Sequence, residues 1–221
     1  MIPVLYCDDT LLICEKPVGV LSESPGLPEL LAKQEGFPVF PVHRLDRTTG
    51  GVCVLARSPQ VCASLQRLFL QDRVVKEYLA VLSGVPETSS GVFTDLLYHD
   101  QRVNKTYVVD KRRKGVREAS CEWNVLETAD GASGAISLVR VRLHSGRTHQ
   151  IRVQFASRRL PLIGDRRYGS RVRAAAPALW AARISFSHPL TGKPVEASSA
   201  PPALFPWSGF THPEPVLEIK P

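Results

Sequence analysis

Short apolar blocks, each bounded by polar or turn-forming residues, run along this chain and predict strands more often than helices. Residues 4–16, VLYCDDTLLICEK, have the pattern of two strands around a turn at Asp8 and Asp9. The apolar run VCVLA at 52–56 has the length and composition of a buried strand. Residues 73–84 alternate in polarity, which predicts a strand with two different faces.

Helical signals are fewer. Ser58 followed by Pro59 is a typical helix start, with Ser as N-cap and Pro at the first helical position. The apolar positions after it recur at helical spacing: Val61, Leu65, Leu68 and Phe69. Thr148 is the predicted N-cap of a second helix over 149–158, which carries Ile151 and Phe155 four residues apart. One or two helical turns are expected over 29–34.

The rest of the pattern completes a mixed fold. Residues 118–127 and 135–144 are two strand candidates, with the turn between them predicted at 130–131. Residues 183–189 and 194–202 end the chain as strand, turn and strand. We therefore expect an α+β fold with a mixed, largely antiparallel central sheet and flanking helices. No stretch is long enough to be a linker, so residues 1–221 are predicted to form a single domain.

Composition excludes several classes of protein. The 221 residues are 43% hydrophobic and 22% charged, which is ordinary for a globular chain. No apolar run approaches the roughly 20 residues that cross a bilayer, and the N-terminus has no basic leader, so a cytoplasmic protein is expected. The five cysteines are scattered without a Cys-x-x-Cys pair, which predicts free thiols rather than a disulfide framework or a zinc site.

Positive charge is concentrated in one segment. The net charge is +7, but residues 140–173 hold ten arginines and one acid, Asp165, so this window carries +9 and the remainder −2. Guanidinium groups bind phosphate bidentately, and a polyanion surface is one interpretation. A solvated basic face is the other. A second cluster, KRRKGVR at 111–117, is predicted to be a hairpin tip or loop that either follows a nucleic-acid backbone or is simply solvated.

One carboxylate stands out in HRLDRTTGG, residues 43–51. Asp46 lies between Arg44 and Arg47, ahead of a Thr-Gly turn and a buried strand. From this stretch alone the acid is either a solvated ion pair or turn cap, or a catalytic group. Catalysis would need an ionised carboxylate, which a nearby guanidinium favours, and a rigid loop. The arginine-rich segment would also have to lie near it.

That segment contains SGRTHQIR at 145–152. Arg147 precedes the helix predicted after Thr148, and helix N-termini bind phosphate. Arg147 and Arg152 are five residues apart and so point in different directions. One is therefore available to phosphate while the other turns inward.

Three stretches in this order, HRLDRTTGGVCVLAR, KEYLAVLSG and GRTHQIRVQ, resemble the signatures of the RluA-type pseudouridine synthases. The opening DDTLLICEKPVGVL and the later LPLIGDRRYG and LWAARISFSHPLTGKPVEASSAPP fit too, so the resemblance runs from about Val4 to Trp207. It implies the pseudouridine synthase fold, with an active-site cleft across the sheet. The small N-terminal RNA-binding domain of many relatives is not expected, so the groove around the active site would make most of the contacts with RNA.

The resemblance also implies a reaction, the isomerisation of specific uridines in ribosomal or transfer RNA to pseudouridine. Asp46 would be the catalytic carboxylate, acting on the base or the sugar; Tyr78 would stack on the base and Arg152 would pair with Asp46. Further residues are implied at the RNA-binding pocket: Arg44, His43, Arg147, Thr148, His149 and Gln150. We expect no metal and no organic cofactor, and a monomer. His43 and His149 are interpreted as hydrogen-bonding scaffold for their loops.

The residues by themselves suit this chemistry. A uridine in folded RNA must be extruded before its ring can be reached, and an aromatic face then supports it. Departures from the family pattern at Thr49, Gln154 and Trp180, and in the Ser-Arg-Arg-Leu-Pro stretch, bear on which RNA is recognised. Two alternatives are a catalytically inactive RNA-binding module and a glycosidase. A glycosidase requires a second carboxylate as acid or base, and none stands out near Asp46 in the sequence.

Overall fold

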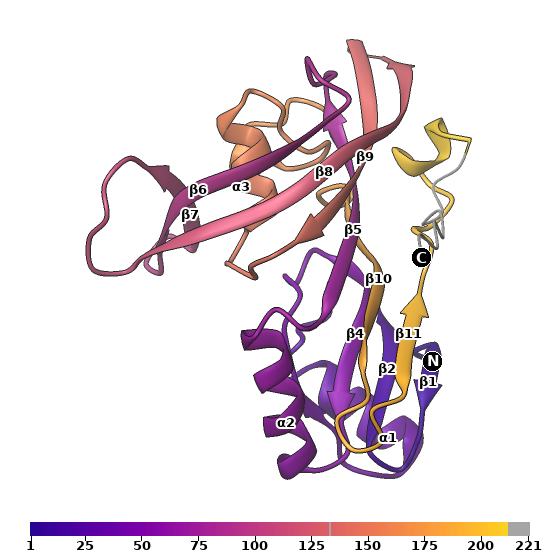
Figure 1. The fold of residues 1–221 in the computed structure, drawn as a ribbon. Coiled ribbons are helices and arrows are strands. Elements are labelled where there is room, and N and C mark those ends of the chain that lie inside the picture. The colour runs from indigo at the N-terminus through magenta and orange to yellow at the C-terminus, as the bar shows by residue number, and fades with distance from the viewer. Residues whose placement is uncertain (133, 212–221) are drawn as a thin grey trace. The chain divides into compact units, whose positions relative to one another are not determined.

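The computed structural model describes residues 1–132 and 134–211, which form two compact units. Unit one comprises residues 1–75 and 180–202, and unit two comprises 76–179 and 203–211. Strands and three α-helices combine as the predicted α+β class requires (Figure 1). That residues 1–221 act as a single domain stays a prediction.

Unit one is built on a small mixed sheet. Its strands are β1 (Val4–Cys7), β2 (Leu11–Lys16), β3 (Phe40–Pro41), β4 (Gly50–Ala56), β10 (Leu179–Ser187, all but its first residue) and β11 (Pro194–Ser198). The order is β1-β2-β4-β10, with β3 on β4 and β11 on β10. Only β4 and β10 pair in parallel; the other pairs are antiparallel. The predicted turn after β1 and the predicted strand at 52–56 are confirmed.

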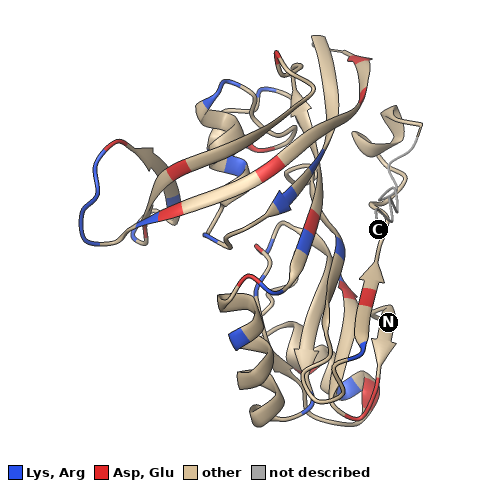
Figure 2. Cartoon of the chain, in the orientation of Figure 1, with Lys and Arg blue, Asp and Glu red and all other residues tan. Residues whose placement is uncertain are grey.

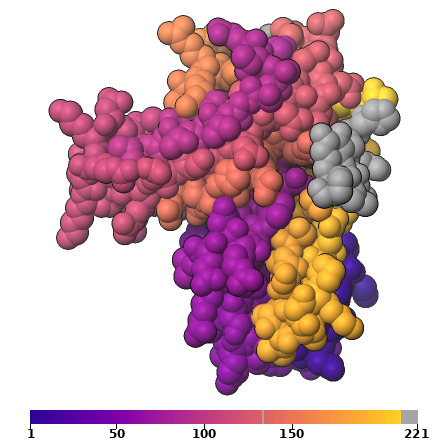
Figure 3. All heavy atoms as spheres, viewed as in Figure 1, coloured from indigo at the N-terminus to yellow at the C-terminus, as the bar shows by residue number. Residues whose placement is uncertain are grey.

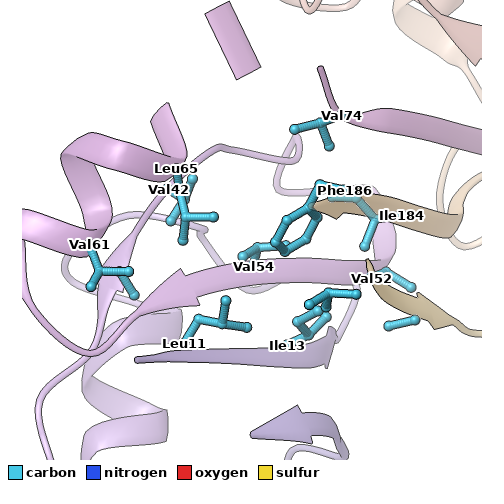
Figure 4. Close-up of a cluster of buried hydrophobic side chains, with 13 residues drawn as sticks. Leu11, Ile13, Val42, Val52, Val54, Val61, Leu65, Val74, Ile184 and Phe186 are labelled. Carbon is cyan, nitrogen blue, oxygen red and sulfur yellow. The ribbon is translucent and has the colours of Figure 1, made fainter. Parts of the chain in front are cut away.

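Helix α2 (Pro59–Leu70) closes the core of this unit. It begins where the sequence predicts, because the Ser58 side chain accepts a hydrogen bond from the Val61 amide at 3.3 Å. Its buried face packs toward β4 and β10, as the close-up in Figure 4 shows for Leu65 and Phe186. Helix α1 (Leu27–Glu35) extends the predicted 29–34 segment and ends at Gly36 in a left-handed conformation.

Unit two is an antiparallel sheet. Its strands are β5 (Val75–Ser83, beginning one residue before the unit), β6 (Ser90–Asp100), β7 (Lys105–Val109), β8 (Val116–Gly131) and β9 (Gly134–Leu143). The order is β5-β9-β8-β6-β7. Helix α3 (Gln150–Ser157) packs its Ile151 and Phe155 into a core with Ala80 and Leu82. Tyr78 packs against this core, so the predicted alternation of β5 is confirmed.

Strands β6 to β8 form an arm of unit two. Figure 2 shows the loop between β7 and β8 lined with basic residues, and the arm projects in the space-filling view of Figure 3. Of the two predictions for 111–117, the loop is confirmed: the segment connects β7 to β8 and its last two residues begin β8. It is not a hairpin tip, because β7 and β8 lie on opposite sides of β6. Strand β7, KTYVV, was not predicted; it is short, and it has one fully buried residue, Thr106.

Two local predictions are corrected. The N-cap of α3 is His149, in a left-handed conformation with φ 55°, and not Thr148. Thr148 instead offers its carbonyl to the Thr106 hydroxyl at 2.7 Å, a contact from another strand that no local pattern contains. The 130–131 pair continues β8, opposite Gly134 and Ala135, so these two residues do not form the predicted turn. Two short 3-10 helices, η1 (Arg166–Tyr168) and η2 (Trp207–Gly209), complete the fold.

No helix among the described residues is long and apolar enough to cross a membrane.

Candidate active site

Asp46 opens a turn at the entrance to β4. Its carbonyl accepts the Thr49 amide at 2.9 Å, and the residue is half-buried. The chain then enters β4 at Gly50, where every residue is buried. The carboxylate is therefore carried by a short turn on a rigid strand, as a positioned catalytic group requires.

The backbone on both sides of Asp46 is fixed by the segment that follows β2. One buried hydroxyl, that of Ser22, accepts the Leu45 amide at 2.9 Å and donates to the Leu45 carbonyl at 3.0 Å. On the other side, Gly19 and Arg47 exchange two bonds: the Gly19 amide donates to the Arg47 carbonyl at 2.8 Å, and Arg47 Nε donates to the Gly19 carbonyl at 2.9 Å. Asp46 thus lies between two anchored neighbours.

A buried cation underlies the same loop. Lys16 ends β2 with no exposed surface, and its Nζ donates to the carbonyls of Pro17 at 3.0 Å and Val20 at 2.7 Å. Burial lowers the pKa of Lys16 to about 8, an effect opposed by the negative charge of Asp46 and by the thiols of Cys53 and Cys14. An ammonium inside unit one therefore contributes to the electrostatic environment of Asp46.

Replacing Lys16 by Met is expected to lower the free energy of unfolding by about 2 kcal/mol at pH 7. Two carbonyls of half-buried residues, Pro17 and Val20, lose their donor at about 1–3 kcal/mol each, and removal of the buried charge offsets part of that. The pKa of Lys16 is lowered in the folded state from 10.5 to about 8, so between these values the unfolded chain binds the proton and the folded chain does not. Wild-type stability therefore rises over this window.

The difference in free energy of unfolding between wild type and Lys16→Met should consequently grow by about 2 kcal/mol between pH 8 and pH 10. Urea unfolding across this range measures it. Lys33→Met, at an exposed lysine in the last turn of α1, is the matched control and should show no such pH dependence. A constant difference between Lys16→Met and wild type would mean that Lys16 keeps an ordinary pKa.

The basic neighbours of Asp46 are engaged in their own contacts. Arg44 is exposed, and its Nη1 pairs with Glu23 at 3.0 Å. The His43 ring stacks on Phe69 with centroids 4.6 Å apart, and its Nε2 lies 3.0 Å from the Val54 amide. Because Nε2 accepts the hydrogen bond from the Val54 amide, the neutral ring of His43 carries its proton on Nδ1. This contact agrees with the scaffold role predicted for His43.

In unit two, Tyr78 lies on β5 opposite Val141 of β9. One part of the ring packs against the core under α3, and the residue remains half-buried. Its position on a strand that is paired along its length gives the ring a fixed support.

Arg152 is held inside unit two by an acid. Its Nε and Nη2 donate to the two Asp165 carboxylate oxygens at 2.6 and 2.9 Å, and the two side chains are 5% and 1% exposed. The guanidinium carbon lies 5.2 Å from the centre of the Tyr168 ring. As expected, Arg152 turns inward while Arg147 is exposed.

A hydrogen-bond network surrounds this pair. The Tyr168 hydroxyl accepts the Thr106 amide at 2.8 Å and lies 3.0 Å from His149 Nδ1. Burial raises the pKa of Tyr168, and the Thr106 amide and the Arg152 charge act against that rise. Buried His149 is thus a structural neighbour of Arg152, as the scaffold interpretation predicts.

Gln150 organises the loop before α3. Its Oε1 accepts from the Ser145 hydroxyl at 2.9 Å and the Arg147 amide at 3.0 Å, and its Nε2 donates to the Ser120 carbonyl at 3.1 Å. The residue is buried, so its side chain serves the loop. Arg147 directs Nε to the Glu118 carbonyl on β8 at 3.1 Å, which places its guanidinium beside the arm.

The predicted residues divide between the units. Asp46, Arg44 and His43 belong to unit one, and Tyr78, Arg152 and the 147–150 segment belong to unit two. Convergence of Asp46, Tyr78 and Arg152 in one cavity stays a prediction.

Two buried charged residues were missed. Asp165 had a signal, since it is the single acid among the arginines of 140–173. Lys16 had a weaker one, as a lysine that ends an apolar strand. Among the described residues, no three His, Cys, Asp or Glu side chains come together in a group that could hold a metal ion.

Known proteins match this chain along most of its length. The RNA pseudouridylate synthase family matches residues 10–157. An uncharacterized RNA pseudouridine synthase of Zymomonas mobilis is 36% identical, over 94% of this chain and 97% of its own. The ribosomal large subunit pseudouridine synthase D of Xanthomonas campestris is 31% identical over 90% of this chain and 66% of its own.

Two further matches complete the comparison. The tRNA pseudouridine synthase C of Vibrio cholerae is 28% identical over 88% of this chain and 89% of its own. The solved structure of human RNA pseudouridylate synthase domain containing 1 superimposes with a TM-score of 0.81, at 24% identity, over 92% of this chain and 85% of its own. These matches confirm the fold and the resemblance found in the motifs.

Proposed function

Since the chain belongs to the RNA pseudouridylate synthase family and is an RNA pseudouridine synthase, we propose that Asp46 carries out its catalysis on a uridine turned out of the RNA. The observation that carries this assignment is the doubly anchored Asp46 turn, in which Ser22 and Gly19 fix the neighbouring backbone. The substrate is ribosomal or transfer RNA, the classes named for two of the relatives.

The reaction is an isomerisation, so every atom of the uridine is retained except for exchange of a proton with solvent. The bond between N1 of uracil and C1′ of ribose breaks, the base turns, and C5 bonds to C1′. The C5 proton is lost and N1 gains one. Asp46 acts as a nucleophile, at C1′ of the sugar or at the base, and it must be ionised to do so. A bond from Asp46 to C1′ breaks when C5 attacks C1′, and a bond to the base breaks after the C5–C1′ bond has formed, so either route returns the carboxylate. Lys16, which donates to the Pro17 and Val20 carbonyls, lies under the Asp46 loop.

Tyr78 supports the base during its rotation. A half-buried ring on a paired strand offers a fixed aromatic face to an extruded nucleotide. Its hydroxyl, near the base, would assist removal of the C5 proton. Arg152 is the cationic partner of Asp46 in this proposal. We further propose that the protein acts as a monomer in the cytoplasm.

The activity is tested with RNA that carries tritium at C5 of uracil. The purified chain should release tritium to water from total ribosomal or transfer RNA of a strain that lacks the gene. Mapping pseudouridine in that strain against its parent then identifies the position. Binding to these RNAs without any tritium release would favour the inactive RNA-binding module instead.

RNA is held in part by the basic surface of unit two. Arg147, in the connection between β9 and α3, donates to the Glu118 carbonyl of β8, near the end of the β7–β8 loop. The side chains of 111–114 and Arg117 are exposed. Two of them already have neighbours, since Arg112 pairs with Glu118 and Arg113 lies 4.7 Å over the Tyr98 ring. Exposed guanidinium and ammonium groups in such numbers suit a phosphate backbone.

Replacing Arg147 by Ala should weaken RNA binding and reduce the salt dependence of affinity by about one unit of slope, because one phosphate contact releases about one counterion. Filter binding from 50 to 300 mM salt measures this slope. Arg183→Ala is the matched control: its charge is locally compensated by Glu196, at 2.8 Å, and it should leave the slope unchanged. An unaltered slope in Arg147→Ala would place Arg147 outside the RNA contact.

A further inference from the structure

We infer that Asp165 is a positioning residue for pseudouridine formation, which acts by holding Arg152 through one defined edge of its guanidinium. The inference rests on the proposed function, in which Arg152 is the partner of the catalytic carboxylate. Its basis is the buried pair of unit two, with Nε and Nη2 of Arg152 on the two oxygens of Asp165 at 2.6 and 2.9 Å.

The pair differs from the other arginine contacts of this segment by its burial. Asp165 is 1% exposed and Arg152 is 5% exposed, whereas Arg158, at the C-cap of α3, is 34% exposed in its pair with Asp95. A buried bidentate pair fixes both the position and the plane of a guanidinium. Because Asp165 occupies Nε and Nη2, Nη1 is the nitrogen through which Arg152 would reach a second carboxylate.

The surroundings of the pair oppose any other orientation. Asp165 is fixed by its own backbone, since its amide donates to the Leu162 carbonyl at 3.0 Å and its carbonyl accepts the Ser170 amide at 3.0 Å. The Tyr168 ring covers the guanidinium, and its hydroxyl is bound by the Thr106 amide of β7. Rotation of Arg152 would therefore break contacts with two other segments.

The charge balance has a chemical consequence. Arg152 brings a positive charge into the interior, and Asp165 compensates it even before any RNA is bound. An arginine prepared in this way can meet a developing negative charge without reorganising during the reaction. Removal of the Asp165 carboxylate should therefore reduce the rate of the chemical step more than the affinity for RNA.

The test is a single-turnover tritium-release assay with enzyme in excess over RNA, next to filter binding and thermal melting. Asp165→Asn is expected to lower the rate constant about 100-fold, the effect of a misplaced catalytic group, and to change the RNA dissociation constant by less than about 3-fold. Asp95→Asn, on β6, is the matched control, because Asp95 is also an acid that holds side chains from α3 and its C-cap. It removes the acid that holds Arg158 and Gln154, at 3.0 and 2.8 Å, and should keep the wild-type rate.

A double-mutant comparison separates positioning from general support. In an Arg152→Lys background, Asp165→Asn should lower the rate by less than about 3-fold, because the group that it positions has already been changed. Equal losses in both backgrounds would overturn the inference. Should Asp165→Asn melt below the assay temperature, Asp165→Glu decides: it keeps the charge but displaces the carboxylate, and a wild-type rate in this folded variant would also overturn it.

The outcome for wild type distinguishes the two proposals. A wild-type enzyme that releases tritium, with Asp46→Asn inactive and Asp165→Asn fully active, leaves the proposed function standing and removes only the role of Asp165. If wild type releases no tritium from any of the RNAs, the proposed function fails and the inference fails with it.

Discussion

Asp46→Asn is expected to abolish tritium release, with a fall in the single-turnover rate of at least about 10³-fold, because an amide cannot replace the attacking carboxylate. The substitution keeps the size of the side chain. The turn should remain intact, since it is held through the backbone of Asp46 and its neighbours by the Thr49 amide and the Ser22 hydroxyl. Filter binding should accordingly show an RNA affinity close to that of wild type.

The control is Asp9→Asn, at a fully exposed acid in the turn between β1 and β2, whose nearest basic partner is Arg57 at 3.8 Å. It should release tritium at the wild-type rate. Full activity in Asp46→Asn would remove Asp46 from the chemistry, and a loss of RNA binding in parallel with activity would point to a structural role instead.

Gly51→Ala is expected to lower the free energy of unfolding by about 4 kcal/mol, the largest stability effect that we predict from one methyl group. Two costs add. Gly51 has a φ of 110°, a conformation that side chains rarely adopt, and a Cβ there would overlap the Ala181 carbonyl oxygen of β10. That oxygen is backbone in a paired strand, so it cannot move aside without disturbing the parallel β4–β10 contact.

Thermal melting checks this as a fall of about 10 °C. Gly36→Ala separates the two costs, because Gly36 has a similarly positive φ of 80° but nothing within 4 Å of its Cβ position. It should lose about 1 kcal/mol, the cost of the backbone conformation alone. Equal losses in the two variants would mean that the contact with Ala181 costs nothing.

Local signals predicted the elements whose stabilising contacts are themselves local. Ser58 and Pro59 fixed the start of α2, because the cap bond joins residues three apart. The alternation of 75–82 predicted the face of β5 that Tyr78, Ala80 and Leu82 share, since the period of a strand acts between neighbours. The N-cap at Thr148 failed for the opposite reason: the Thr106 hydroxyl, from a distant strand, binds the Thr148 carbonyl.

The Gly-Gly pair after the Asp46 turn also combines a feature that the local sequence predicts with one that a distant contact imposes. Its sequence predicts a turn, but the need for glycine at Gly51 arises from Ala181, on a strand far along the chain. The sequence likewise placed Arg147 and Arg152 in different directions, but it did not indicate that Asp165 is a partner of Arg152. Asp165 was visible as an isolated acid, yet its pairing with Arg152 depends on how η1 returns to α3.

By itself, the sequence determined the family, the reaction and the candidate residues, because motif identity and residue spacing are written along the chain. Only the tertiary structure decided which charges are buried and what holds them: Lys16 on two carbonyls, and Arg152 on Asp165. The physical reason is that burial and ion pairing depend on distances through space between segments far apart in sequence. A local pattern contains no record of those distances.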